Sequence, residues 1–96
     1  MSHQVCAAIT NRRLLSAFYE GGSRTIEPYC HGFSKSDDEL LRAFQISGFS
    51  QSGESTGWKL FRLDRLEAIS VLDRGFAPRA GYNPDDPAIR RIHCRV

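Results

Sequence analysis

Hydrophobic and polar positions repeat with two different periods along this chain. Val5, Ala8 and Ile9 are spaced as on one face of a helix, which predicts a helix over residues 3–12. Beyond Arg13 the period changes to two, which is typical of half-buried strands. We predict five strands, over residues 14–19, 24–33, 40–46, 58–63 and 68–72. The pattern therefore indicates a mainly β chain with one short N-terminal helix.

The segments between the predicted strands are short and carry turn residues. Glu20-Gly21-Gly22 is a hairpin signal, and residues 50–57 form a polar loop. Pro28 has no backbone N–H to donate, so it places a bend or a bulge within the second strand. Short strands with tight connections favour closure into a small barrel, because closure removes exposed sheet edges.

The character of the sequence changes at Gly75. Five residues that break regular elements follow it: Pro78, Gly81, Asn83, Pro84 and Pro87. Residues 75–87 are therefore expected to be extended, and residues 88–96 remain open between a strand and a helix. We predict that residues 1–75 form one β domain and that residues 76–96 form an extended C-terminal tail, which packs on that domain or on a partner.

Side-chain alternation along a strand assigns each residue to one face of the sheet. It predicts a core of six apolar side chains: Leu41, Ala43, Phe61, Leu63, Ile69 and Val71. The opposite face of the third and fourth strands carries Arg42, Phe44 and Arg62, with Trp58 further along. Two guanidinium groups beside two aromatic rings suit a phosphate held next to a stacked base. The alternative also stays open that this face is a second side of the core, with its arginines paired to carboxylates at the rim.

Composition narrows the range of functions. The chain has 96 residues, of which 41% are hydrophobic and 25% charged, which fits one small globular domain and not a two-lobed enzyme. The net charge of +2 excludes a histone-like nucleic-acid coat. Eleven of the thirteen basic residues are arginine, whose planar fork suits phosphates and carboxylates. A high-GC codon bias explains the same excess equally well.

The three cysteines are Cys6, Cys30 and Cys94, an odd number with no closely spaced pair. This usage favours a reducing cytoplasm over a disulfide framework, so we predict three free thiols. The longest apolar run near the N-terminus, residues 5–9, is far too short for a signal peptide or a membrane span. We therefore expect a cytoplasmic chain that does not cross a membrane.

Candidate metal and catalytic motifs are weak. Neighbouring Cys and His residues at 30–31 and 93–94, with His3 and Cys6, offer metal ligands by residue type. The usual Cys-x2-Cys pairs are absent and adjacent residues rarely both reach one metal, so no zinc site is expected. Residues 53–57 match the G-x-S-x-G nucleophile pattern in letters, but they lie in a predicted hairpin loop. We expect no enzymatic activity and no cofactor.

A family resemblance is carried by strings spread over residues 5–77. They are Asn11-Arg12-Arg13, Tyr19 at a strand end, Arg24-Thr25-Ile26-Glu27-Pro28-Tyr29, Phe61-Arg62-Leu63-Asp64-Arg65-Leu66, and then Ile69, Val71, Leu72-Asp73 and Phe76. In these strings the chain resembles the WYL domain of bacterial regulatory proteins. The family's namesake tripeptide falls at Glu39-Leu40-Leu41, where only the last leucine is kept.

The resemblance implies both a fold and a ligand site. WYL domains have an Sm-like or SH3-like five-strand barrel, usually sit behind a helix-turn-helix, and are thought to bind nucleic acid or a nucleotide-like effector. The pocket residues that the resemblance implies, position by position, are Glu39, Leu40, Arg42, Arg62 and Arg65. Phe44 or Trp58 is the ring that we expect beside these arginines.

These observations predict a non-enzymatic regulatory domain that senses a nucleotide-like or single-stranded nucleic-acid ligand in bacterial transcriptional or defence regulation. Only residues 1–13 precede the first predicted strand, so we expect a protein partner to carry the DNA-binding function. We also expect a homodimer, because small β folds leave open sheet edges. The alternative function is a protein–protein interaction module without a small-molecule ligand. Exposed rings beside the arginines favour the first function, whereas a contiguous apolar patch favours the second.

Overall fold

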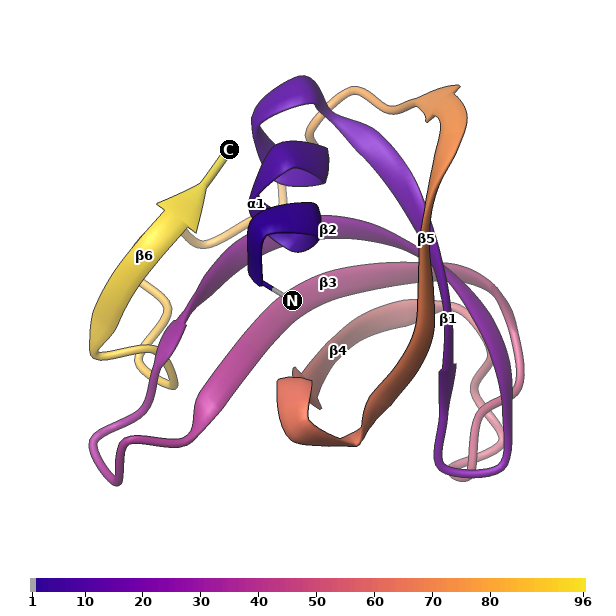
Figure 1. Cartoon of the computed structure of the whole chain (residues 1–96), viewed down its shortest axis with the longest axis horizontal. Coiled ribbons are helices and arrows are strands. Elements are labelled where there is room, and N and C mark those ends of the chain that lie inside the picture. Colours follow the sequence, from indigo (N-terminus) through magenta and orange to yellow (C-terminus); the bar gives the residue numbers. More distant parts are fainter. Residues whose placement is uncertain (1) are drawn as a thin grey trace.

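The computed structural model describes residues 2–96 and shows one antiparallel sheet with a short helix packed against it (Figure 1). The elements are α1 (Ser2–Asn11), β1 (Arg13–Tyr19), β2 (Gly22–Phe33), β3 (Glu39–Gly48), β4 (Gly57–Arg62), the 3-10 turn η1 (Leu63–Arg65), β5 (Leu66–Gly75) and β6 (Arg91–Arg95). The predicted helix and five strands are confirmed, with small changes at their ends. The sixth strand settles the state of the C-terminal residues, which the sequence left open between strand and helix.

The strands follow the order β4-β3-β2-β1-β5, and β6 pairs with β2. Strand β2 has two different neighbours along one side: its first half pairs with β1 as far as Ile26, and its second half pairs with β6 from Cys30 onward. Pro28 lies between these two halves, where β2 pairs with neither β1 nor β6. Its missing N–H therefore removes no hydrogen bond from the ladders on this side of β2. The register against β3 also shifts between Pro28 and Cys30, which confirms the predicted irregularity.

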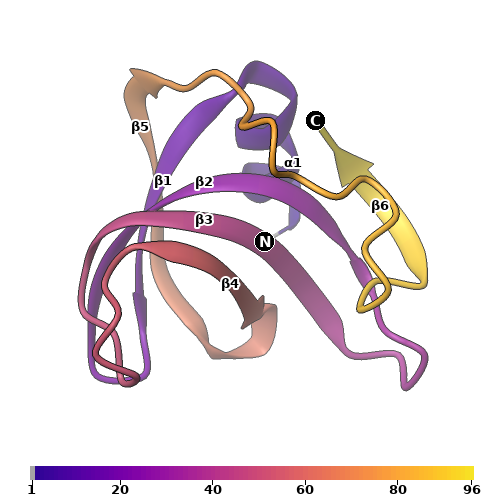
Figure 2. The same ribbon diagram turned by 180° about the vertical axis from the view of Figure 1, so that it is seen from behind.

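The sheet is strongly curled, as Figures 1 and 2 show from opposite sides, but it is not closed. Strands β4 and β5 lie at the two ends of the strand order, and within residues 2–96 no ladder joins them. The chain passes from one to the other through η1. A mainly β fold is therefore shown, whereas the predicted five-strand barrel is not confirmed.

The turn between β1 and β2 is the tight hairpin that the sequence predicts. Glu20 and Gly21 both have positive φ, at 40° and 105°. Two successive positive φ angles give the backbone the twist that a two-residue hairpin needs, and glycine adopts such an angle without steric cost. The β1–β2 pairing runs up to this turn, with Tyr19 opposite Gly22.

The main core lies between α1 and one face of the sheet. Val5, Ala8 and Ile9 of α1 are fully buried, as their helical spacing predicts. Four of the six predicted core residues are at most 2% exposed in the same cluster: Leu41, Ala43, Phe61 and Leu63. Alternation therefore assigns the faces of β3 and β4 correctly.

Strand β5 departs from the predicted core. Ile69 packs against the core only partly buried, and Val71 is 39% exposed, so the prediction that Val71 is a core residue is wrong. Val71 lies opposite Leu15 of β1 on an edge strand with a neighbour on one side only. The β1–β5 register also shifts near Ala68, whose φ is positive, and a bulge of this kind bends an edge strand.

The segment between β5 and β6 covers part of the other face of the sheet, over β2 and β3. Figure 2 shows it running from the end of β5 past β2 to β6. A second cluster joins Ile89 of this segment to Cys30 and Leu40 of the sheet, with Tyr82 packed against them. Because both of its faces are covered, β2 is buried without alternation from Ile26 to Gly32.

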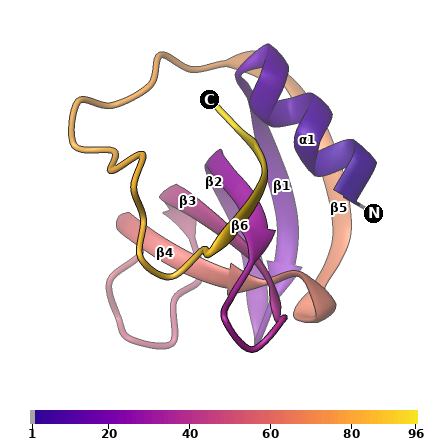
Figure 3. The same ribbon diagram turned by 90° about the vertical axis from the view of Figure 1, so that its left-hand side faces the viewer.

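Cys6 and Cys94 form a disulfide, so the prediction of three free thiols is wrong. The two residues are 88 positions apart in the sequence, and no local spacing indicates that they meet. They meet because β6, which carries Cys94, pairs with β2 and contacts α1, which carries Cys6. Figure 3 shows the ribbons of these three elements. Only Cys30 remains free, and it is buried.

Residues 2–96 contain no helix that could cross a membrane. The α-helix α1 has ten residues, and no helix in this part of the chain is both long and apolar enough to span a bilayer.

Candidate functional site

The β3–β4 hairpin presents the face that the sequence singles out. In its ladder Arg42 lies opposite Leu60, Phe44 opposite Trp58, and Leu40 opposite Arg62. Directly opposite residues of an antiparallel pair share a face. The alternation argument is therefore right in placing the two arginines and the two rings on one side of the sheet.

A cavity of about 260 Å³ opens between this face and the segment that follows β5. Its walls come from two strand residues and six residues of the later segment: Arg42, Trp58, Gly81, Tyr82, Asn83, Asp86, Pro87 and Ala88. Of the residues proposed from the sequence, Arg42 and Trp58 therefore share the cavity. The others do not line it.

Arg42 is held in the cavity wall by Asp86. The Nε of Arg42 donates to Oδ2 of Asp86 at 2.6 Å and its Nη2 donates to Oδ1 at 3.2 Å. The backbone N–H of Ala88 donates to the same Oδ1 at 3.0 Å. Burial of Asp86 works toward a higher pKa, but the hydrogen bonds from Arg42 and Ala88 and the charge of Arg42 outweigh it, so the pKa of Asp86 lies below its usual value. The guanidinium is thus fixed, and its charge is balanced locally.

Trp58 is the centre of an aromatic cluster beside this pair. Its ring meets Tyr29 at a centroid distance of 4.8 Å and Phe44 at 5.2 Å, both edge to face. The ring of Tyr82, which also lines the cavity, has its centroid 6.2 Å from that of Trp58. Gly81 lies beside the indole N–H, and a Cβ added there would reach the Trp58 Nε1 at 3.8 Å, an ordinary contact distance. Trp58 is therefore a half-buried ring that packs against other rings and lines the cavity.

Arg62 and Arg65 lie outside the cavity, each in an ion pair of its own. The Nη2 of Arg62 is 3.0 Å from Oδ2 of Asp64 and 3.5 Å from Oδ1 of Asp38. Arg65 pairs with Glu20 at 2.8 Å. The Arg62–Asp64 pair is one that the alternative interpretation expects at the rim.

The remaining residues proposed from the sequence have other contacts. Leu40 is 7% exposed under Ile89, and Glu39 accepts a hydrogen bond at 2.6 Å from the Nε2 of His31. Phe44 lies under the guanidinium of Arg79, whose Cζ is 3.8 Å from the ring centroid.

Sequence reasoning missed the contributions of Asp86 and Arg79 altogether. Both belong to the irregular segment after β5, where no period indicates which way a side chain points. Their charge was the only available signal, and charged residues are common in loops. The residues that alternation could place were the strand residues Arg42 and Trp58.

Comparison of the chain with protein-family models, with curated proteins and with solved structures gives no match. The resemblance to WYL domains consequently rests on the strings within residues 5–77 alone. Any function must be argued from the cavity and from the side chains around it.

Proposed function

We propose that this chain is a non-enzymatic regulatory domain whose cavity binds a single planar, nitrogen-bearing ring, such as the base of a nucleoside or nucleotide. The observation that carries the proposal is that the Trp58 ring and the Arg42–Asp86 pair line one cavity. An aromatic face with a few fixed polar groups is the usual composition of a small-molecule site.

Each wall of the cavity has a role in such binding. The Trp58 ring offers a face on which a base stacks, which contributes about 1–3 kcal/mol per base. The Asp86 carboxylate accepts three hydrogen bonds within the protein and retains capacity for an N–H of a ligand. Asn83 adds an amide with both a donor and an acceptor. Together these groups offer hydrogen bonds to the polar atoms at the edge of a heteroaromatic ring.

The size and charge of the cavity limit the ligand. A volume of about 260 Å³ is at the small end for ligand pockets and suits one ring system with its sugar outside. The Arg42–Asp86 pair is electrically balanced, so it does not provide the excess positive charge that several phosphates require. A nucleoside or a monophosphate fits these limits better than a triphosphate. The resemblance to WYL domains supports the same class of ligand.

The chain offers its own reporter for the test, because Trp58 is its one tryptophan. We expect nucleosides, their monophosphates or a short single-stranded oligonucleotide to change the tryptophan fluorescence and raise the melting temperature. A ligand at 100 times its dissociation constant stabilises the fold by about 2.7 kcal/mol. Trp58→Leu should abolish the melting shift. Phe18→Leu, which alters an exposed ring on β1, should leave it unchanged.

A second variant decides between two definitions of the site. If the ligand sits in the cavity, Arg62→Ala leaves its affinity nearly unchanged, because Arg62 does not line the cavity. If the ligand sits on the arginine cluster expected from the sequence, Arg62→Ala weakens binding at least about tenfold, since a charge-assisted hydrogen bond contributes about 1.5–3 kcal/mol. Failure of every probe to shift fluorescence or melting would contradict the proposed function.

The alternative function, a protein–protein interaction module, is favoured by the free edge of β4. This strand has a neighbour on one side only, and its Leu60 is 38% exposed on the same face as Arg42. An extended peptide adds to such an edge through backbone hydrogen bonds. Leu60→Asp would then abolish capture of a partner while leaving nucleoside binding intact.

A further inference from the structure

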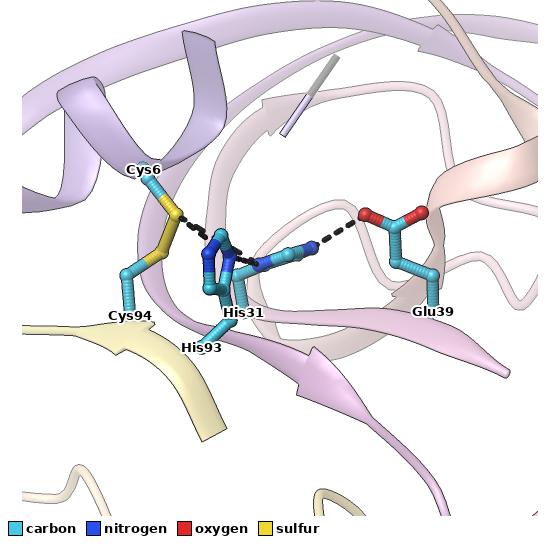
Figure 4. The surroundings of a disulfide bond; sticks show 5 residues. All are labelled: Cys6, His31, Glu39, His93 and Cys94. Carbon is cyan, nitrogen blue, oxygen red and sulfur yellow. Dashed lines mark hydrogen bonds and ion pairs between the residues drawn. A yellow bond between two sulfur atoms is a disulfide. The ribbon is translucent and has the colours of Figure 1, made fainter. Parts of the chain in front are cut away.

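Four potential metal ligands converge beside α1, on the opposite face of the sheet from the cavity. Cys6 comes from α1, His31 from β2, and His93 and Cys94 from β6. One ligand atom from each of the four lies within 4.8 Å of those of the other three. Figure 4 shows the two imidazole rings directed toward the sulfur atoms.

A bulge explains how adjacent residues reach one point, which the sequence argument considered unfavourable. In the β2–β6 ladder Cys94 lies opposite His31 and Ile92 lies opposite Gly32, so His93 is an extra residue on β6. A bulge places two successive side chains toward the same side and changes the direction of one of them. The adjacent pair His93-Cys94 therefore contributes two ligands, and no Cys-x2-Cys spacing is needed.

Three distances within the cluster are close to those of a tetrahedral site, whereas the two sulfur atoms are bonded to each other and must separate on reduction. The two histidine Nδ1 atoms are 3.0 Å apart. The Sγ of Cys6 is 3.5 Å from the Nδ1 of His93 and 3.8 Å from that of His31. Tetrahedral zinc, with bonds of about 2.3 Å to sulfur and 2.0–2.1 Å to nitrogen, has edges of about 3.3 Å between nitrogens and about 3.5 Å between nitrogen and sulfur.

The buried histidine is oriented as a metal ligand. His31 has no exposed surface, and its Nε2 lies 2.6 Å from Oε2 of Glu39. A proton on Nε2 leaves the Nδ1 lone pair directed at the cluster. Metal-binding histidines commonly have a carboxylate on the far nitrogen, which fixes the tautomer and the ring. Glu39 thus acts as a positioning residue for His31.

We propose that the reduced chain binds one Zn²⁺ through the thiolates of Cys6 and Cys94 and the Nδ1 atoms of His31 and His93. Two sulfur and two nitrogen ligands in tetrahedral arrangement favour zinc over the hard cations, which take oxygen. All four positions are filled by protein, so the site is structural. It ties α1 and β6 to β2, which suits a chain of 96 residues with a small core.

The same two cysteines make the metal site and the disulfide mutually exclusive. With hydrogen peroxide as oxidant, the two thiolates give up two electrons and form the S–S bond. The peroxide takes these electrons with two protons and leaves as two water molecules, and Zn²⁺ is released because its sulfur ligands are gone. His93 is exposed, so metal and oxidant have access, whereas the Cys30 thiol is buried. The structure shows the oxidised form.

Co²⁺ is the probe for this site, because its absorption spectrum reports which ligands bind it and in what geometry. The full chain is reduced with a phosphine, freed of metal with a chelator, and titrated with Co²⁺. We expect one equivalent per chain, with thiolate-to-cobalt charge transfer in the near ultraviolet and the visible bands of tetrahedral cobalt. Zn²⁺ should displace the cobalt and raise the melting temperature of the reduced chain.

Matched variants test which side chains are responsible. Cys94→Ser and His93→Gln should remove or greatly weaken the cobalt bands. His3→Gln and Cys30→Ala, a histidine and a cysteine outside the cluster, should retain them. Should Cys94→Ser fail to fold, the wild-type chain gives the same answer, because peroxide treatment should abolish cobalt binding and renewed reduction should restore it.

The contrary results are equally specific. A reduced chain with three titratable thiols that gives no tetrahedral cobalt spectrum overturns the proposal. So does a spectrum that peroxide leaves unchanged, or one that Cys30→Ala abolishes while Cys94→Ser does not. Nucleoside binding at the cavity does not enter any of these measurements, so this inference and the proposed function stand or fall separately.

Discussion

Arg42 and Arg62 lie on the same face of the sheet, yet their ion pairs differ in exposure. In the Arg42–Asp86 pair the side chains are 25% and 6% exposed, whereas in the Arg62–Asp64 pair they are 39% and 64% exposed. Exposed pairs contribute little because water already solvates both charges. A buried carboxylate that loses its partner keeps the full cost of its desolvation.

The two arginines should therefore respond differently to truncation. We expect Arg42→Ala to lower the free energy of unfolding by about 2–3 kcal/mol near neutral pH, because Asp86 loses two charge-assisted hydrogen bonds. Arg62→Ala should cost less than about 1 kcal/mol. Chemical denaturation of both variants measures the difference, and equal losses would contradict the assignment.

At low pH the free energies of unfolding of the Arg42→Ala variant and the wild type should become more similar. The folded-state pKa of Asp86 is below its usual value, so the folded chain holds this proton more weakly than the unfolded chain does. The stability that it contributes is present above the usual aspartate pKa of about 3.9 and is lost as the pH falls through the folded-state value. Denaturation curves of wild type and Arg42→Ala should therefore converge at low pH.

The pKa of Tyr29 is shifted upward, so this residue should lower the stability of the fold at alkaline pH. Burial, together with the nearby Glu27 carboxylate, raises the pKa of Tyr29 to about 12, although the N–H of Arg79 partly opposes the shift. The unfolded chain loses this proton near pH 10 and the folded chain holds it longer, so stability falls as the pH rises from about 10 to about 12.

Tyr29→Phe should remove part of that alkaline loss. The variant also lacks the hydrogen bonds of the hydroxyl to Glu27 and from Arg79, which contribute about 1–2 kcal/mol at neutral pH. Its stability should therefore be lower than wild type at neutral pH and decline less steeply above pH 10. Parallel curves for the two proteins would show that Tyr29 is not the titrating group.

Among the elements, those that pair with their neighbours in the sequence could be predicted, whereas those that pair with distant segments could not. The helix and the five early strands were predictable because each carries its own period, and the Glu20-Gly21 turn joins strands that follow one another. Strand β6 was not, since it pairs with β2 across most of the chain. The bulge at His93 has no signature in one sequence, and the Cys and His cluster depends on it.

At Gly32 the C-terminal segment and β6 pack directly against the backbone of β2. A Cβ at this position would overlap the carbonyl oxygen of Arg91 and the side chain of Ile89. We expect Gly32→Ala to separate β6 from the sheet, with loss of hydrogen-exchange protection over residues 91–95 and retained protection in β3 and β4. Gly81→Ala, whose added methyl meets Trp58 Nε1 only at 3.8 Å, is the matched control and should leave protection unchanged.

For the molecule as a whole, the open edges are the main surface left for association. β4 and β5 each have one neighbour, and they expose Leu60 and Val71. Ile89 of the C-terminal segment is buried within the chain, whereas Ile92 is 42% exposed. We predict a dimer formed through a sheet edge, with a light-scattering mass near twice 10.8 kDa. A mass of one chain at every concentration would contradict it.

The link between Cys6 and Cys94 also determines how the molecule bears mechanical load. A pull applied to the chain on either side of this link passes through one covalent bond and not through the sheet, so the segment between the two cysteines, which are 88 positions apart, does not extend. Once the bond is opened, the same pull can draw that segment out to about 300 Å. A degradation motor that grips one end would therefore have to translocate a closed loop while the link is intact, and a single strand after it is reduced.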